Sequence, residues 1–296
     1  MAIAPPSSRF LLILLRRSHR GPHTNDSSMD DTPPIIRVEH LVKRFGDVVA
    51  VNDVTFDVRR GEIFAFLGPN GAGKTTTIRM LTTLLPPTGG TLELDGLDPV
   101  HQQNAVRRRI GVVFQDPSLD QDLTAWENLD LHGVLYGVPR VERHERAQRL
   151  LELFELADRR SAVVKTFSGG MRRRLEIARG LLHTPRVLFL DEPTLGLDPQ
   201  SRNQMWTHVQ SLNQSDGVTV FLTTHYMDEA DRVAHRIAVI DHGRIVAIGS
   251  PAELKQRTST ESLEAAFLAL TGSAIREELS GATDRMRDAA RMWRRR

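Results

Sequence analysis

A glycine-rich stretch that ends in a lysine and a threonine is the part of the sequence best suited to chemistry. It reads Gly68-Pro69-Asn70-Gly71-Ala72-Gly73-Lys74-Thr75 and fits the pattern G-x-x-x-x-G-K-[ST] without a mismatch. Glycines let backbone N–H groups turn toward an anion, and a helix that starts here adds its positive end. We therefore predict a polyphosphate site in which Lys74 reaches the β- and γ-phosphates, Thr75 places its hydroxyl on Mg²⁺ and Thr76 also binds the nucleotide.

Two adjacent carboxylates form a second candidate group. Asp191 and Glu192 end the apolar run Arg186–Glu192. We expect Asp191 to hold the Mg²⁺ shell, directly or through water, and Glu192 to orient or activate a water that attacks the γ-phosphate. Alone, an Asp-Glu pair after a strand is more often a helix cap or a solvated edge, but the glycine-rich loop favours the chemical interpretation.

Both groups follow short apolar runs, which are typical of strands buried on both faces. Glu62–Leu67 precedes the loop, and Thr76–Leu85 has helical spacing up to Pro86-Pro87. The other predicted strands are Ile35–Val42, Val54–Val58, Thr91–Leu94, Ile110–Phe114, Val187–Leu190, Val218–Leu222, Ile237–Ile240 and Ile245–Ile248. Strands that alternate with helices predict an α/β fold with a mainly parallel sheet and helices on both of its faces.

The pattern is helical from Leu123 to Leu182, with a heavily charged stretch at Val141–Arg149 that we assign to a solvated helix face. We predict a helical insert within the α/β domain, at about residues 116–182.

Composition narrows the class of protein. Lys and Arg total 39 against 37 Asp and Glu, so net charge indicates no partner. The sequence has no cysteine, which excludes disulfides, thiolate metal sites and cysteine nucleophiles. The apolar run Phe10–Leu15 is far shorter than the roughly 20 residues that span a bilayer.

That apolar run is flanked by Arg9 and Arg16, as in a signal peptide. We favour a disordered leader over residues 1–33, with Met29 as an alternative start, because Pro5, Pro6, Gly21 and Pro22 interrupt the segment.

A third motif reads Phe167-Ser168-Gly169-Gly170-Met171-Arg172-Arg173. Ser168 is placed as an N-cap, and Gly169 and Gly170 expose backbone N–H groups, which makes a second anion site. With the other two motifs, this stretch resembles the ABC transporter ATPases, whose signature is usually Leu-Ser-Gly-Gly-Gln. Met171 cannot supply the amide of that glutamine. Arg172–Arg174 either adds positive charge near the phosphates or forms a solvated helix face, and we favour the solvated face.

The resemblance extends from about Ile35 to Pro251 and implies roles for further residues. It implies that Phe45 stacks on adenine, although a packing role in a hairpin is the alternative. It implies that Gln115 contacts the Mg²⁺ and water region and that His225 lies near the γ-phosphate. The resemblance implies that Glu192, His225 and Gln115 are catalytic. It implies that Thr75, Gln115 and Asp191 are metal ligands. The implied nucleotide-binding residues are Phe45, residues 68–76, Ser168, Gly169 and Gly170.

The same resemblance implies an ATP hydrolase with a P-loop NTPase fold of the ABC type. Its mainly parallel core carries an antiparallel β subdomain and the helical insert, over residues 34–250, and a short basic helical tail follows at 251–296. Each ATP is expected between the P-loop of one chain and the signature of a second, so a homodimer is implied.

The amino-acid sequences of three segments resemble those of the multidrug and antibiotic-resistance exporter ATPases of the daunorubicin-resistance type. These segments are Thr124–Leu129, Phe167–Arg174 and Leu263–Gly272. This implies export of a small molecule through a separate integral membrane permease that docks on the helical insert, at the cytoplasmic face of the cell membrane. Sugar importer ATPases usually carry a long C-terminal domain, for which residues after Pro251 leave no room.

The alternative is a non-transport ABC ATPase that acts on nucleic acid or the ribosome. DNA-repair types insert a long coiled coil between the motifs, and ribosome-acting types carry two ATPase domains. The terminal arginines can bind nucleic acid, lie on anionic lipid or remain solvated, and we favour the last two and expect no nucleic acid. They are Arg285, Arg287, Arg291, Arg294, Arg295 and Arg296.

Overall fold

The structure is a computed structural model that describes residues 33–272. The predicted leader, apart from residue 33, and the arginine-rich end of the predicted tail lie outside the described residues. Within residues 33–272, no helix has both the length and the apolar character needed to cross a membrane.

A six-stranded sheet in the order β5-β6-β7-β3-β8-β9 is the core of the described part. All neighbouring strands are parallel except β8 and β9. Every residue of β3, β6 and β7 is buried, which is why these runs are apolar without alternation. The prediction of a mainly parallel sheet is confirmed. The strands are β3 (Ile63–Leu67), β5 (Ile110–Val113), β6 (Val187–Asp191), β7 (Thr219–Thr224), β8 (Arg236–Asp241) and β9 (Arg244–Gly249).

A smaller antiparallel sheet has the order β2-β1-β4, with β1 (Ile36–Phe45), β2 (Val48–Val58) and β4 (Gly89–Leu94). Strands β1 and β2 are longer than predicted, because the part near their turn is half exposed and lacks a strong apolar alternation. Phe56 of β2 packs on Phe64 and Phe66 of the central sheet, at ring-centre distances of 5.6 and 5.4 Å. These aromatic contacts join the two sheets.

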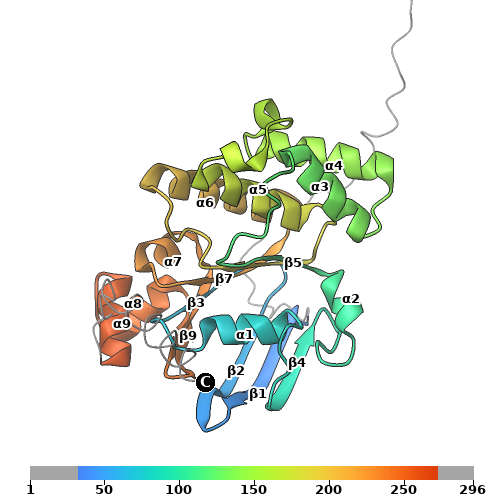
Figure 1. Ribbon diagram of the computed structural model, residues 1–296. Helices are drawn as coiled ribbons and strands as arrows, with labels where there is room; N and C mark the ends of the chain where they lie inside the picture. Colours follow the sequence, from blue (N-terminus) through green and yellow to red (C-terminus); the bar gives the residue numbers. More distant parts are fainter. Residues whose placement is uncertain (1–32, 273–296) are drawn as a thin grey trace, which may run out of the picture. The chain divides into compact units, whose positions relative to one another are not determined.

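Figure 1 shows α1 and the antiparallel sheet on one side of the central sheet and α3 to α6 on the other. The helices are α1 (Lys74–Leu81), α2 (Gln103–Arg107), α3 (Ala125–Leu135), α4 (Arg140–Leu153), α5 (Gly169–Leu181), α6 (Pro199–Asp216), α7 (Met227–Val233), α8 (Pro251–Thr258) and α9 (Leu263–Thr271).

Helix α1 begins two residues earlier and ends four residues earlier than predicted. Thr83 adopts a left-handed backbone with φ of 66°, and the N–H groups of Leu84 and Leu85 both donate to the carbonyl oxygen of Arg79. This closed turn ends the helix well before Pro86-Pro87, so the prolines are not what stops it.

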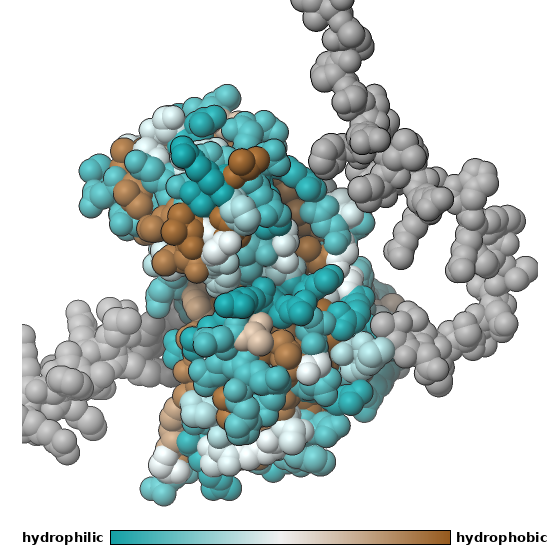
Figure 2. Space-filling model, turned by 90° about the vertical axis from the view of Figure 1, so that its right-hand side faces the viewer, coloured by the Kyte–Doolittle hydropathy of each residue, from teal (hydrophilic) through white to brown (hydrophobic). Residues whose placement is uncertain are grey.

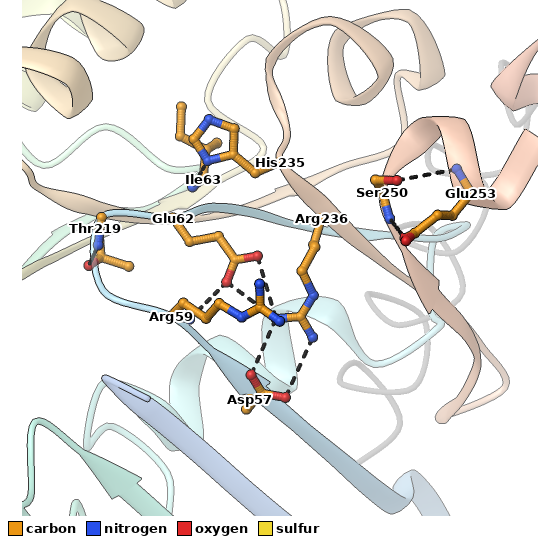
Figure 3. Close-up of polar contacts among 10 residues, drawn as sticks. Asp57, Arg59, Glu62, Ile63, Thr219, His235, Arg236, Ser250 and Glu253 are labelled. Atoms are coloured by element: carbon orange, nitrogen blue, oxygen red, sulfur yellow. Dashed lines mark hydrogen bonds and ion pairs between the residues drawn. The ribbon is translucent and has the colours of Figure 1, made fainter. Parts of the chain in front are cut away.

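The amino-terminal end of β3 is tied to its neighbours by a polar cluster (Figure 3). Arg236 Nη1 lies 3.2 Å from Asp57 Oδ2 and 3.4 Å from Glu62 Oε2, while the N–H of Ile63 donates to His235 Nδ1 at 3.1 Å. These contacts fix β3 at one end, and the glycine-rich loop leaves from its other end.

Candidate active site

The glycine-rich loop connects the carboxyl end of β3 to α1 and approaches backbone closely at two glycines. A Cβ on Gly68 would lie 2.3 Å from the carbonyl oxygen of Ile240, and one on Gly73 would lie 2.6 Å from that of Ala50. Gly73, with φ of 105°, is also the N-cap of α1 and has no side chain to bond the first-turn N–H groups. The first-turn N–H groups of α1 therefore have no side-chain cap, which leaves them available to an anion, and the polyphosphate site stays a prediction.

Lys74 is the first residue of α1 and its side chain is 4% exposed. Its Nζ donates to the carbonyl oxygens of Gly68 at 2.8 Å and Pro69 at 3.1 Å, and lies 3.2 Å from Glu192 Oε1. The ammonium thus lies over the loop and bridges it to the end of β6.

The hydroxyl of Thr75 and the carboxylate of Asp191 meet beside Lys74. Thr75 Oγ1 donates to Asp191 Oδ1 at 3.2 Å, and Thr223 Oγ1 donates to the same oxygen at 2.6 Å. Asp191 is 1% exposed. A hydroxyl and a carboxylate that converge in this way are the hard oxygen donors that Mg²⁺ prefers, so the predicted ligands fit the ion.

Glu192 is held in an unusual backbone conformation. Its φ of 46° is left-handed, and its N–H donates to the backbone oxygen of Thr223 at 3.1 Å and to Thr223 Oγ1 at 3.0 Å. Strain of this kind persists only where the surroundings fix it, and it aims the side chain away from the sheet toward Lys74 and His225.

The carboxylate of Glu192 lies between two cationic or titratable partners. His225 Nδ1 is 3.2 Å from Glu192 Oε2, on the opposite oxygen from Lys74. Burial raises the pKa of Glu192, but the contact with His225 and the charge of Lys74 outweigh it, so the net pKa lies below the usual value. The group is therefore ionised at neutral pH and can accept a proton.

Within residues 33–272, no hydrogen bond or ion pair joins three of the predicted residues to Lys74, Asp191 or Glu192. Phe45 is 50% exposed at the end of β1, with Lys43 Nζ 5.1 Å from its ring centre. Gln115 is exposed just after β5. Ser168 caps α5 by accepting from the N–H of Met171 at 3.2 Å, and no hydrogen bond or ion pair of residues 33–272 joins it to the loop at 68–75.

Sequence reasoning missed two residues. Thr223 binds both Asp191 and Glu192. The only feature of the sequence that could have pointed to Thr223 is its place between a predicted strand and His225. Arg173, which we assigned to a solvated helix face, is 7% exposed and pairs with Glu176. That assignment was wrong for Arg173, because an arginine can be buried when an acidic partner one turn away neutralises it.

The comparisons with known proteins agree with this geometry. Residues 51–195 match the family described as ABC transporter. The chain is 50% identical over 228 residues to the daunorubicin/doxorubicin resistance ATP-binding protein DrrA of Streptomyces peucetius, covering 77% of this chain and 69% of that protein. It is 48% identical over 221 residues to the Nod factor export ATP-binding protein I of Ralstonia nicotianae, covering 75% and 68%.

A solved structure described as the dimeric post-hydrolysis state of an ATP-binding cassette bound to ADP and Pi is also similar. Its TM-score is 0.65 at 29% identity, with 73% of this chain and 98% of that chain covered. The fold and site define a P-loop nucleotide hydrolase. The chain belongs to the ATP-binding proteins of ABC transporters and is an ATP hydrolase. The resemblance to ATPases of the drug-resistance type is thereby confirmed.

Proposed function

We propose that this ATPase powers export of a drug, an antibiotic or another small molecule through a separate membrane subunit. The export proposal is supported by sequence identity. The chain is 50% identical to an ATP-binding protein named for drug resistance and 48% identical to one named for Nod factor export. The observation that carries the hydrolytic part of the proposal is the position of Glu192 between Lys74 and His225.

The loop residues and Lys74 bind the phosphates of ATP through backbone N–H groups and one ammonium. Thr75 and Asp191 would hold Mg²⁺, with Gln115 as a third ligand, and the ion would neutralise charge on the β- and γ-phosphates. Glu192, ionised through its contacts, orients the attacking water and accepts its proton. His225 holds the second carboxylate oxygen and lies on the γ-phosphate side.

We also propose that two chains form each ATP site. Ser168, Gly169 and Gly170 stand at the start of α5, and no hydrogen bond or ion pair among residues 33–272 joins them to the loop at 68–75, so we infer that a second chain supplies them to complete the site. The dimeric state of the similar cassette supports this arrangement. Phe45, exposed at the end of β1, offers its ring to adenine.

The membrane partner is proposed to be an integral permease that docks on the helical insert, which places the chain at the cytoplasmic face of the cell membrane. Helices α3 and the start of α4 expose the apolar residues Leu131, Val134, Leu135 and Val141. Figure 2, which looks onto the side of the molecule that carries α3 and α4, shows hydrophobic residues among hydrophilic ones over the helical part. An exposed apolar group of this kind is typical of a protein interface.

We infer an ATPase domain at residues 34–250 that includes a helical subdomain at about 116–182. A leader at 1–33 precedes this domain, and a basic tail at 251–296 follows it.

The proposal is tested by affinity purification of the full chain from gently solubilised membranes. We expect a multi-span membrane protein to co-purify with the wild type and to be lost in Leu135→Glu, which leaves basal ATP hydrolysis unchanged. The control is Leu84→Glu, another exposed leucine, which follows α1. Bound ribosome or DNA, with salt-dependent stimulation of hydrolysis and no membrane protein, would instead support the non-transport alternative.

A further inference from the structure

One face of α5 is directed at the backbone of residues 114–118 and not at solvent. Arg173, Glu176 and Arg179 are spaced three residues apart and so share this face. Arg179 Nη1 donates to the carbonyl oxygen of Ser118 at 2.7 Å, and the other two residues bind the same segment.

Arg173 binds the first two residues of the segment 114–118. Its Nη1 donates to the carbonyl oxygen of Phe114 at 2.7 Å, and its Nη2 donates to that of Gln115 at 3.1 Å. Planar guanidinium groups can hold two acceptors in a fixed direction, which an ammonium group cannot do. The carbonyl groups of the peptide bonds before and after Gln115 are therefore both held by α5.

Glu176 holds the other end of the segment and neutralises Arg173. Its Oε1 accepts from the N–H of Ser118 at 2.7 Å, and its Oε2 accepts from Arg173 Nη1 at 2.9 Å. The side chains of Arg173 and Glu176 are 8% and 3% exposed. A buried ion pair gains little stability over an apolar pair, so what this pair contributes is its three hydrogen bonds to the backbone of residues 114–118.

The segment itself has no regular secondary structure, and the side chains of Gln115, Asp116 and Ser118 are exposed. Its direction after β5 is thus set by the contacts from α5. The same helix begins at Gly169 beside Ser168, where a Cβ on Gly170 would lie 2.5 Å from Ser201 Oγ of α6. Helix α5 consequently carries the signature residues at its start and, about one turn later, holds the backbone of Gln115 through Arg173.

We propose that Arg173 and Glu176 are positioning residues that fix Gln115 to α5, so that Gln115 moves with the signature residues of its own chain. The proposal rests on the proposed function, because the role of Gln115 at the Mg²⁺ and water region is part of it. In a dimer with two shared sites, movement of one α5 would then place Gln115 at one ATP while Ser168 contacts the other.

The test uses the full-length double variant Arg173→Met/Glu176→Leu, which replaces the buried pair with apolar residues of similar size. Because such replacements are often neutral for stability, we expect Tm to stay within about 3 °C of the wild type. We expect kcat to fall about tenfold while KM for ATP stays within about twofold, since the phosphate loop is untouched. Amide hydrogen exchange at Ser118 should become fast, while the amides of α5 keep their protection.

The matched control is Arg174→Met, which removes the next arginine along α5, whose partner Glu155 is largely exposed. It should leave kcat and the exchange of Ser118 unchanged. If the double variant fails to fold, Arg173→Lys keeps the charge and loses the second carbonyl contact, and the same fall in kcat at unchanged KM is expected.

Wild-type kcat in the double variant would overturn the proposal. A fall in kcat that is fully explained by a loss of stability, seen as a matching fall in Tm, would also overturn it. The variant Glu192→Gln tests the hydrolytic part of the proposed function separately. Normal turnover by that variant would remove the catalytic assignment, whereas an inactive Glu192→Gln beside a fully active double variant would remove only the role of Arg173 and Glu176.

Discussion

Lys74 Nζ lies 3.2 Å from Glu192 Oε1, so the lysine assigned to the phosphates is also an ion-pair partner of the proposed base. Both side chains are largely buried, at 4% and 10% exposure. A phosphate group that binds Lys74 must compete with this carboxylate. Nucleotide binding and the charge environment of Glu192 are therefore linked through one ammonium group.

The substitution Glu192→Gln removes the proposed base and the charge that holds Lys74. We expect steady ATP turnover to fall by at least about 100-fold, the lower range for loss of a general base. ATP affinity should be kept or increased, because Lys74 no longer has a competing anion, and an ATP-bound dimer should accumulate in size-exclusion chromatography. Turnover at the wild-type rate would exclude Glu192 from this role.

The substitution Lys74→Ala should instead weaken binding itself. Loss of a charge-assisted contact with phosphate should raise the Kd for ATP by about tenfold or more, measured by calorimetry. Lys255→Ala is a suitable control, because Lys255 pairs with Asp231 at 2.8 Å between α8 and α7. Binding at full strength in Lys74→Ala would contradict the assignment of the phosphate site.

The substitution Gly68→Ala tests the close approach of the loop to β8. The added Cβ would lie 2.3 Å from the carbonyl oxygen of Ile240, so backbone must move. We expect a loss of roughly 1–3 kcal/mol in the free energy of unfolding, typical of overpacking, together with weaker ATP binding. Gly217→Ala, where no atom lies within 4 Å but φ is 65°, should cost only about 1 kcal/mol and leave ATP binding unchanged.

Acid should destabilise the helical insert through His132 of α3. Burial, together with the nearby positive charge of Arg179 and of His183, lowers the pKa of His132 from 6.5 to about 3. The folded state thus binds this proton less readily than the unfolded chain. The stability contributed by neutral His132 is present above pH 6.5 and is lost progressively as the pH falls toward 3.

The substitution His132→Phe keeps a ring beside Tyr136, whose centre lies 4.6 Å from that of His132, and removes the titration. The free energy of unfolding of this variant, measured with urea at pH 7, 6, 5 and 4, should fall less steeply than that of the wild type. His242→Asn, where the side chain is 92% exposed, should keep the wild-type slope. Equal slopes for His132→Phe and the wild type would show that this ring does not titrate in the unfolding reaction.

The sequence by itself determined the phosphate loop, the carboxylates after β6 and the buried parallel strands. These features are local: the loop needs glycines at fixed spacing, and a strand buried on both faces must be apolar throughout. Asp191 and Glu192 were predicted beside the loop because they end a buried apolar run, whereas the place of His225 was implied only by the resemblance to the ABC ATPases. In the structure Asp191 ends β6 and His225 follows β7, and the carboxyl ends of these neighbouring parallel strands meet at one edge of the sheet.

Only the tertiary structure decided which polar groups face one another. The contact of Lys74 with Glu192, the two bonds from Thr223 and the burial of Arg173 each join residues far apart in the sequence, or depend on which face of a helix is covered. A charged residue on a helix has the same local pattern whether water or the backbone of Gln115 lies against it. Its environment is set by the packing of α5 on the rest of the fold, which the order of residues along one helix does not encode.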